Sequence, residues 1–319
     1  MQAHPSSISK TAPAANKVKN RPAPKLAKNL NSARIERVVY LWEDKTDGCS
    51  TNRLCRHQRR EDLLRGRGRG PALPHVHAGL ANKDMWDDQF DFFAQKYKVV
   101  RYDMRGYGQS PPVADEFQPH EDIRALLDFL NIDRAYLMGC SMGGGMCMDF
   151  ALEYPDRAAA LIMVGSGPDG FSYDDWSPSA LIEEMEEAYE KGDMERVNEA
   201  AMKIFIDGQG RTPNQVSPAL RQKVYEMNAI ALQNENQRGK AISPAVPAAQ
   251  RITDLQLPVL IVVGDLDEEY AARAANFMEE NITGARKVVM RGTAHLPNME
   301  FPKEFNAHVQ EFLDSLPAH

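Results

Sequence analysis

The chain has 319 residues, of which 43% are hydrophobic, enough to bury one large core or two smaller ones. Its formal net charge of -7, with no basic stripe in the part that carries motifs, argues against a nucleic-acid-binding protein. No apolar run approaches the length of a membrane span, and four cysteines without regular spacing do not indicate a disulfide framework. We interpret Cys140 and Cys147 as buried, reduced thiols, which favours a cytoplasmic protein.

The first 70 residues match no motif, and we treat 1–70 as a separate N-terminal segment. Its beginning, Met1 to about Asn31, is rich in Ala, Pro, Ser, Lys and Asn and has no acidic residue before Glu36. This composition favours a disordered tail. A transit peptide is the alternative, because the segment is basic and contains serine, although its prolines disfavour an amphipathic helix.

Residues Cys55 to Gly70 show neither strand alternation nor a helical stripe. One interpretation is a basic, flexible linker. The other is translation out of frame. With one set of permitted codons, reading one base later encodes Val-Asp-Ile-Asn-Gly-Glu-Lys-Ile-Tyr-Tyr-Glu-Val-Ala-Gly-Glu-Gly. That hidden peptide has an Asn-Gly turn between apolar, β-branched and aromatic runs, as a β-hairpin has. Codons in the gene that are incompatible with the shift would refute this hypothesis.

From His77 onward, short apolar runs alternate with helical stripes. After a turn at 77–86, we predict a helix at 87–96, a strand at 98–102, a helix at 120–130, a strand at 135–138, a helix at 142–153 and a strand at 159–164. Further strands are expected at 257–263 and 287–290, with a closing helix at 302–316. This alternation predicts an α/β fold with a mostly parallel central sheet flanked by helices.

The alternation breaks between about Asp169 and Lys240, where only helices are predicted, at 179–191, 194–206 and 217–232. An insertion of this kind is expected to form a helical cap over the carboxyl edge of the sheet, where ligands bind. The sequence therefore predicts a core of residues 71–168 and 241–319 and a cap of residues 169–240.

A G-x-S-x-G pattern, Gly139-Cys-Ser-Met-Gly143, lies between the predicted strand at 135–138 and the predicted helix at 142–153. Small residues two before and two after the serine let the backbone turn sharply and raise Ser141 Oγ above the sheet edge. Because serine is a weak nucleophile, it needs an adjacent base. Two later loops that follow strands carry aspartates, Asp265 and Asp267, and a histidine, His295, in the order Ser, Asp, His.

With these residues in place, the chain resembles the α/β-hydrolase superfamily, and within it small esterases and enol-lactonase-like enzymes. Five motifs carry the resemblance, and together they span about Val76 to the C-terminus: the oxyanion turn His77-Ala-Gly79, the loop Asp103-Met-Arg-Gly-Tyr-Gly-Gln-Ser110, the nucleophile turn, the acid loop Gly264-Asp-Leu-Asp267 and the histidine loop Gly292-Thr-Ala-His295. The hidden peptide would resemble the first two strands of the family.

The resemblance implies a catalytic triad. Ser141 would be the nucleophile, His295 the general base, and Asp267, rather than its neighbour Asp265, the acid that orients the histidine. The oxyanion hole would use the backbone N–H groups of Met142 and Gly79.

Several neighbouring positions are less tightly specified. Leu80 is the alternative to Gly79 as the second oxyanion donor, and Ala78 stands where the family commonly has glycine. His77 is interpreted as a residue that stabilises the turn. Asp103 and Arg105 are interpreted as an internal pair that braces the loop.

The resemblance therefore implies a serine hydrolase that needs no cofactor or metal and cleaves a small ester, lactone or related acyl substrate through an acyl-enzyme. Its partner would be that small molecule, with neither nucleic acid nor membrane involved. A C–C bond hydrolase or a perhydrolase would use the same triad. The alternative from another class is a non-catalytic, ligand-binding protein of the hydrolase fold, impaired by an altered N-terminus.

Overall fold

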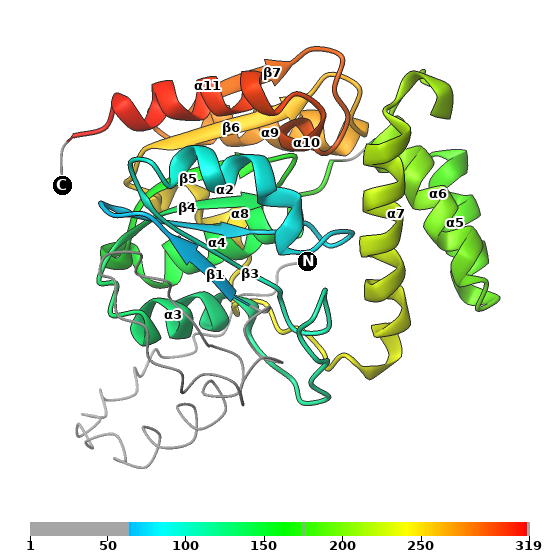
Figure 1. The fold of residues 1–319 in the computed structure, drawn as a ribbon, viewed down its shortest axis with the longest axis horizontal. Helices are drawn as coiled ribbons and strands as arrows, with labels where there is room; N and C mark the ends of the chain where they lie inside the picture. The colour runs from blue at the N-terminus through cyan, green and yellow to red at the C-terminus, as the bar shows by residue number, and fades with distance from the viewer. Residues whose placement is uncertain (1–63, 174, 176, 318–319) are drawn as a thin grey trace, which may run out of the picture. The chain divides into compact units, whose positions relative to one another are not determined.

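The computed structural model describes residues 64–317 except 174 and 176, all of them in Val38–His319, one of the two units into which the chain divides. A seven-stranded sheet has the order β1-β3-β2-β4-β5-β6-β7. Only β1 runs antiparallel to its neighbour, and the other pairs are parallel (Figure 1). The strands are β1 Leu64–Arg67, β2 Ala72–Val76, β3 Lys98–Tyr102, β4 Ala135–Cys140, β5 Ala158–Val164, β6 Val259–Gly264 and β7 Arg286–Met290.

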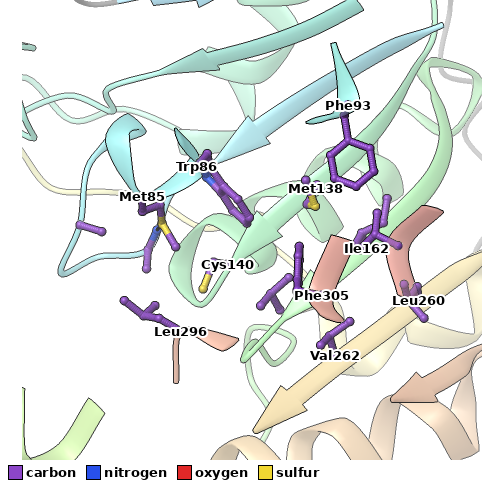
Figure 2. Packing of buried hydrophobic residues seen from close by; sticks show 14 of the residues in the cluster. Met85, Trp86, Phe93, Met138, Cys140, Ile162, Leu260, Val262, Leu296 and Phe305 are labelled. Atoms are coloured by element: carbon purple, nitrogen blue, oxygen red, sulfur yellow. Dashed lines mark hydrogen bonds between the residues drawn. The ribbon is translucent and has the colours of Figure 1, made fainter. Parts of the chain in front are cut away.

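Helices α2 (Asp87–Phe93) and α11 (Pro302–Asp314) pack on one face of the sheet. Figure 2 shows Phe93 and Phe305 in the same buried cluster as Met138 and Ile162. Side chains alternate between the two faces of a strand, so the residues next to Met138 and Ile162 in β4 and β5 point to the opposite face of the sheet. There α4 (Met142–Glu153) packs on β4 and β5 and against α3 (Pro119–Phe129), while α9 (Glu269–Asn281) packs on β6. The remaining core helices are short: α8 Ala248–Arg251 and α10 Pro297–Glu300.

The predicted fold class is confirmed: the chain forms an α/β-hydrolase fold with a mostly parallel sheet between helices. The strand Lys98–Tyr102 and the helix Met142–Glu153 have the predicted bounds. Strand β2 and helix α9 were not predicted. Strand β2 was missed because it contains Pro74 and His75. Proline lacks the N–H that a central strand donates, so its presence argues against a strand assignment.

The expectation that Cys55–Gly70 contains no strand is wrong at Leu64–Arg67, which pairs with β3 at the edge of the sheet. Gly68 and Gly70 follow with φ angles of 94° and 104°, and a Cβ atom there would lie 2.1 Å from Tyr97 O and 2.4 Å from Lys96 O, respectively. Both positions therefore require glycine. The hidden peptide also ends in Gly-Glu-Gly, so both reading frames supply it. Residues 1–63, including the rest of this segment, lie outside the described residues, and the frame hypothesis stays a prediction.

Residues 169–240, between β5 and β6, are mostly helical, and we call this segment the helical insertion (Figure 1). It contains α5 (Ala180–Glu190), α6 (Met194–Met202) and α7 (Pro218–Gln233), with short turns η4 (Pro213–Gln215) and η5 (Glu235–Gln237). The helix predicted over 194–206 changes after Met202 into a π-helix, η3 (Lys203–Asp207). In the described part of the chain, no helix is both long and apolar enough to cross a membrane.

Candidate active site

Ser141 lies at the turn between β4 and α4 with φ 52° and ψ -120°. Among the described residues other than glycine, only Ser141 and Asn131 have a positive φ angle. Such a conformation costs energy and persists where its surroundings hold it. Here the Ser141 N–H donates to Val164 O at 2.8 Å, and the Ser166 hydroxyl donates to Ser141 O at 2.7 Å. The end of β5 therefore holds the serine turn.

The small residues of the G-x-S-x-G pattern are required by close backbone contacts. A Cβ atom at Gly139 would lie 2.3 Å from Gly143 O, and one at Gly143 would lie 2.5 Å from both Val76 O and His77 O. Real Cβ atoms do not approach backbone oxygens that closely. The pattern thus brings the start of α4 directly against the turn that follows β2.

The acid and histidine loops meet in a buried pair. His295 Nδ1 lies 2.9 Å from both carboxylate oxygens of Asp267. Burial disfavours the charged imidazole, but the Asp267 carboxylate outweighs burial and raises the pKa of His295 above its ordinary value. The pairing also assigns the ring proton to Nδ1 in the neutral tautomer, which leaves Nε2 as the basic nitrogen.

Asp265, the other aspartate of this loop, does not contact the histidine; its carboxylate accepts the Gly292 N–H at 2.6 Å. A residue that sequence reasoning missed, Gly165, lets the end of β5 approach the pair. Its φ angle is 50°, and a Cβ atom there would lie 3.2 Å from His295 Nδ1 and 3.3 Å from Asp267 Oδ2. The only sequence signal was a glycine directly after a strand.

Ser141 bonds to Val164, and His295 lies beside the next residue, Gly165. The serine and the histidine therefore both flank the end of β5. No hydrogen bond joins Ser141 Oγ to the histidine ring within the described residues. Catalytic hydrogen bonds are commonly long in the absence of substrate and shorten in the reacting complex.

The two residues predicted to supply the oxyanion N–H groups are neighbours in the structure. Gly79 lies beside Met142: a Cβ atom on Gly79 would be 3.6 to 3.8 Å from three atoms of the Met142 side chain. Neither N–H donates a hydrogen bond to another described group, whereas the Ala78 N–H is turned to Met85 Sδ at 3.3 Å. The structure thus brings together the two predicted donors.

His77 holds the turn that carries Gly79. Its Nδ1–H donates to Ala78 O at 2.8 Å, and its Nε2 accepts the Met104 N–H at 2.9 Å. Burial lowers the pKa of His77 to about 4, and the bond to Ala78 O opposes that effect only in part. The ring is therefore neutral at pH 7, and both nitrogens serve the backbone of neighbouring loops.

Asp103 and Arg105 each brace the structure, but not as a pair with one another, which corrects the predicted interaction. The Asp103 carboxylate accepts the Lys83 and Gln109 N–H groups at 2.8 and 3.0 Å and pairs with Lys83 Nζ at 3.2 Å. Arg105 instead forms a two-point ion pair with Asp122 at 2.6 and 2.7 Å.

No group of three or more His, Cys, Asp or Glu side chains in the described ranges is arranged to hold a metal ion. Separately, the arrangement supplies a strained serine, a histidine paired with a carboxylate, and two backbone N–H groups that have no hydrogen-bond acceptor among the described residues.

Comparison with known proteins places these features in a family. Residues 71–302 match the family described as alpha/beta hydrolase fold. The chain is 27% identical over 254 residues to a pimeloyl-[acyl-carrier protein] methyl ester esterase from Aeromonas hydrophila, covering 77% of this chain and 96% of that protein. It is also 27% identical over 248 residues to a 3-oxoadipate enol-lactonase from Acinetobacter baylyi, covering 77% and 89%.

A third relative has a different kind of name. The chain is 27% identical over 257 residues to a 2-hydroxy-6-oxo-6-phenylhexa-2,4-dienoate hydrolase from Comamonas testosteroni, covering 77% of this chain and 88% of that protein. The three relatives share this fold and are all hydrolases. The family match covers well over half of the chain, and we conclude that it belongs to the α/β-hydrolase fold family and is a hydrolase enzyme.

Proposed function

We propose that the protein is a serine hydrolase that cleaves a small ester, lactone or related acyl substrate through Ser141, His295 and Asp267. The observation that carries this proposal is the buried Asp267–His295 pair beside a serine held in a strained turn. The relatives named as esterase and enol-lactonase support acyl chemistry at such a site.

In the proposed reaction, His295 Nε2 accepts the proton of Ser141 Oγ as that oxygen attacks the acyl carbonyl carbon. The Asp267 carboxylate stabilises the imidazolium that forms. The carbonyl oxygen becomes an anion, and the N–H groups of Met142 and Gly79 stabilise it. His295 then returns the proton to the leaving oxygen, and water releases the acyl group by the same steps in reverse order.

The helical insertion, which we propose acts as a cap, would shape the space above Ser141. Its α7 contacts the core where Lys223 Nζ donates to Asp84 O at 2.9 Å, and Asn234 of the next turn donates to Gly106 O at 3.0 Å. Arg238 stacks 4.4 Å from the ring of Tyr107, whose hydroxyl lies 3.9 Å from Met142 Sδ. The insertion therefore adjoins the proposed oxyanion donor, where it would select among substrates.

Reaction with a fluorophosphonate, followed by mass spectrometry of the peptides, tests the assignment. We expect one adduct, on Ser141, and none in the Ser141→Ala variant. The wild type should also hydrolyse a short p-nitrophenyl ester that Ser141→Ala does not. Folded wild-type protein that forms no adduct would contradict the enzyme assignment and favour a non-catalytic protein of this fold.

C–C bond hydrolysis is the second candidate, because one relative is named as a hydrolase of a 2-hydroxy-6-oxo-dienoate. A substrate panel that varies acyl chain length and lactone ring size, with one 2-hydroxy-6-oxo-dienoate added, distinguishes the two. A kcat/KM that is highest for the dienoate would assign C–C chemistry.

A further inference from the structure

The π-helix η3 of the helical insertion lies against the loop that carries His295. The His295 N–H donates to Phe205 O at 3.1 Å, and the two rings lie 5.0 Å apart between centroids at an angle of 45°. A single π-turn at the end of an α-helix is rare and frequently marks a functional site. Here it places a carbonyl group and an aromatic ring against the proposed base.

The residues directly after η3 contact the acid loop as well. Gly208 has φ 71°, and a Cβ atom there would lie 2.6 Å from Leu266 O and 2.7 Å from Ala294 Cβ. The Gln209 N–H donates to Leu266 O, and Gln209 Nε2 donates to Asp267 O, both at 2.8 Å. One segment of the insertion thus touches both loops of the proposed triad.

Arg211 joins this segment to the histidine loop. Towards the π-helix, its Nε and Nη2 donate to Asp207 O at 2.5 Å and to Ile206 O at 2.9 Å. Towards the histidine loop, its Nη1 donates to Gly292 O at 3.0 Å and to the Glu300 carboxylate at 2.7 Å.

Glu300 completes the connection, because its other oxygen accepts the Ala294 N–H at 2.6 Å, one residue before His295. The side chains of Arg211 and Glu300 are only 13% and 6% exposed. We call these two residues the Arg211–Glu300 bridge.

We propose that Arg211 and Glu300 are positioning residues that fix the His295 loop to the π-helix of the insertion, so that the reach of His295 towards Ser141 depends on the insertion. The inference rests on the proposed function. Neither residue touches the serine or the histidine ring. They determine the position of the His295 ring, and a misplacement of about 1 Å in an active site lowers the rate about a hundredfold.

The insertion offers a matched control in Arg221. Its guanidinium is 18% exposed and pairs with Asp207 at 3.0 Å and with Glu199 at 2.6 Å. Among the described residues, Arg221 thus has two charged contacts, both within the insertion, and no hydrogen bond or ion pair with the histidine loop. A loss of insertion stability is shared by Arg211 and Arg221 variants, but a loss of base positioning is specific to Arg211.

The experiment compares Arg211→Lys, Glu300→Gln and the control Arg221→Lys in the full chain, with a short p-nitrophenyl ester as substrate. Lysine keeps the charge of Arg211 but is a point donor that cannot contact both sides. For Arg211→Lys we expect kcat to fall about tenfold or more, KM to change less than about threefold, and fluorophosphonate labelling of Ser141 to slow by the same factor as kcat, because both need the positioned base. Arg221→Lys should change kcat less than about twofold.

The pH profile gives a second readout. The acidic groups near His295 are Asp267 and Glu268. The Cys140 thiol lies against His295 O, and burial raises the pKa of this thiol well above its ordinary value, so the thiol stays neutral. A loosened loop weakens the Asp267 contact that raises the pKa of His295. The acid limb of kcat/KM should therefore move to lower pH in Arg211→Lys and Glu300→Gln, and should not move in Arg221→Lys.

Two results would overturn the positioning role while leaving the function intact: bridge variants with wild-type kcat, or bridge variants that lose kcat only as much as Arg221→Lys at equal melting temperature. A rise in KM alone would also overturn it, since that indicates a role in substrate binding. Wild-type protein that is not labelled at Ser141 would instead refute the proposed function, and the inference with it.

Discussion

The two sides of the candidate site are held by different kinds of interaction. On the acid–histidine side, the helical insertion bonds to the loops after β6 and β7 through Phe205, Gln209 and the Arg211–Glu300 bridge. On the oxyanion side, which comprises residues 77–85 and 103–110, buried ionisable groups hold the loops: neutral His77 and the Lys83–Asp103 pair. Both sides contact the insertion, but the first is tied to it next to the histidine itself. The second depends more on the protonation states of its own buried side chains.

The largest expected effect concerns the acid–histidine side. Asp267→Asn leaves the shape of the loop but replaces a charged acceptor with an amide, so His295 loses its correct tautomer and the stabilisation of its charge. By analogy with serine proteases, kcat should fall by about ten-thousandfold. Steady-state turnover of a p-nitrophenyl ester measures it.

Asp265→Asn is the matched control for this change. Asp265 lies in the same loop, but its carboxylate contacts the Gly292 N–H and not the histidine. A small loss of kcat is expected there. A larger loss for Asp265→Asn than for Asp267→Asn would reverse the assignment of the acid.

On the oxyanion side and in the adjoining strand β2, acid should destabilise the fold. Burial lowers the pKa of His77 to about 4 and, together with the Arg101 charge, that of His75 to about 3, against 6.5 for each when unfolded. As pH falls below 6.5 the unfolded chain binds these protons first, so stability is lost through that range and the loss ends near pH 3 to 4. From pH 7 to pH 5 the two histidines should together cost about 4 kcal/mol of unfolding free energy.

Urea denaturation at pH 7 and pH 5 measures this loss. The variant His75→Leu, described below, serves as the reference, because it removes the contribution of one of the two histidines and keeps that of all other groups. An unfolding free energy that does not fall between these pH values would mean that the two rings are not held neutral in the fold.

Asp103→Asn tests the buried Lys83–Asp103 ion pair on the oxyanion side. The substitution keeps the shape of the side chain but leaves the Lys83 ammonium, 2% exposed, with Asp84 at 3.6 Å as its one remaining acidic partner among the described residues. A buried charge deprived of its partner costs about 3 kcal/mol or more. Urea denaturation measures the loss.

The exposed pair Arg67–Asp91 provides the control, because Asp91→Asn should cost less than about 1 kcal/mol. Equal losses for Asp103→Asn and Asp91→Asn would show that the buried pair does not hold the oxyanion side.

The same contrast explains how much of the molecule could be predicted from sequence. Clear apolar runs predicted the strands that precede the serine, the two candidate aspartates and the histidine. The fold class followed from the alternation of these strands with helices. The contacts between loops could not be predicted. Nothing around Phe205 or Arg211 indicates that they meet the histidine loop some 80 to 90 residues later, and nothing around Gln209 indicates that it meets the acid loop. These contacts depend on how a helix ends in a π-turn.

Strand β2 was missed for a related reason. Pro74 and His75 interrupt its apolar pattern, and only neighbours β3 and β4, on either side, make the segment a strand. Helix α9 was missed although its buried face is regular, because that face consists largely of alanine: Ala271, Ala274 and Ala275. Small residues give a weak periodic signal, and here they allow close packing.

The smallest expected effect separates two histidines that lie two residues apart. His77 bonds to two backbone groups, whereas neither ring nitrogen of His75 has a partner among the described residues, and its ring packs 5.3 Å from Trp86. Replacing an unpaired buried polar group with an apolar one of similar size removes its desolvation cost. His75→Leu should therefore stabilise the protein by about 1 to 2 kcal/mol at pH 7 in urea denaturation.

At pH 5 the gain should grow by about 2 kcal/mol, because leucine takes no proton in the unfolded chain. His77→Leu is the matched variant and should do the opposite at pH 7, since it leaves the Ala78 carbonyl and the Met104 N–H without their partner. If both variants lost stability alike, His75 would have to make polar contacts equivalent to those of His77. Opposite signs would show that ionisation alone does not hold the oxyanion side: the hydrogen bonds that neutral His77 makes are what stabilise it, and His75 only adds to its sensitivity to acid.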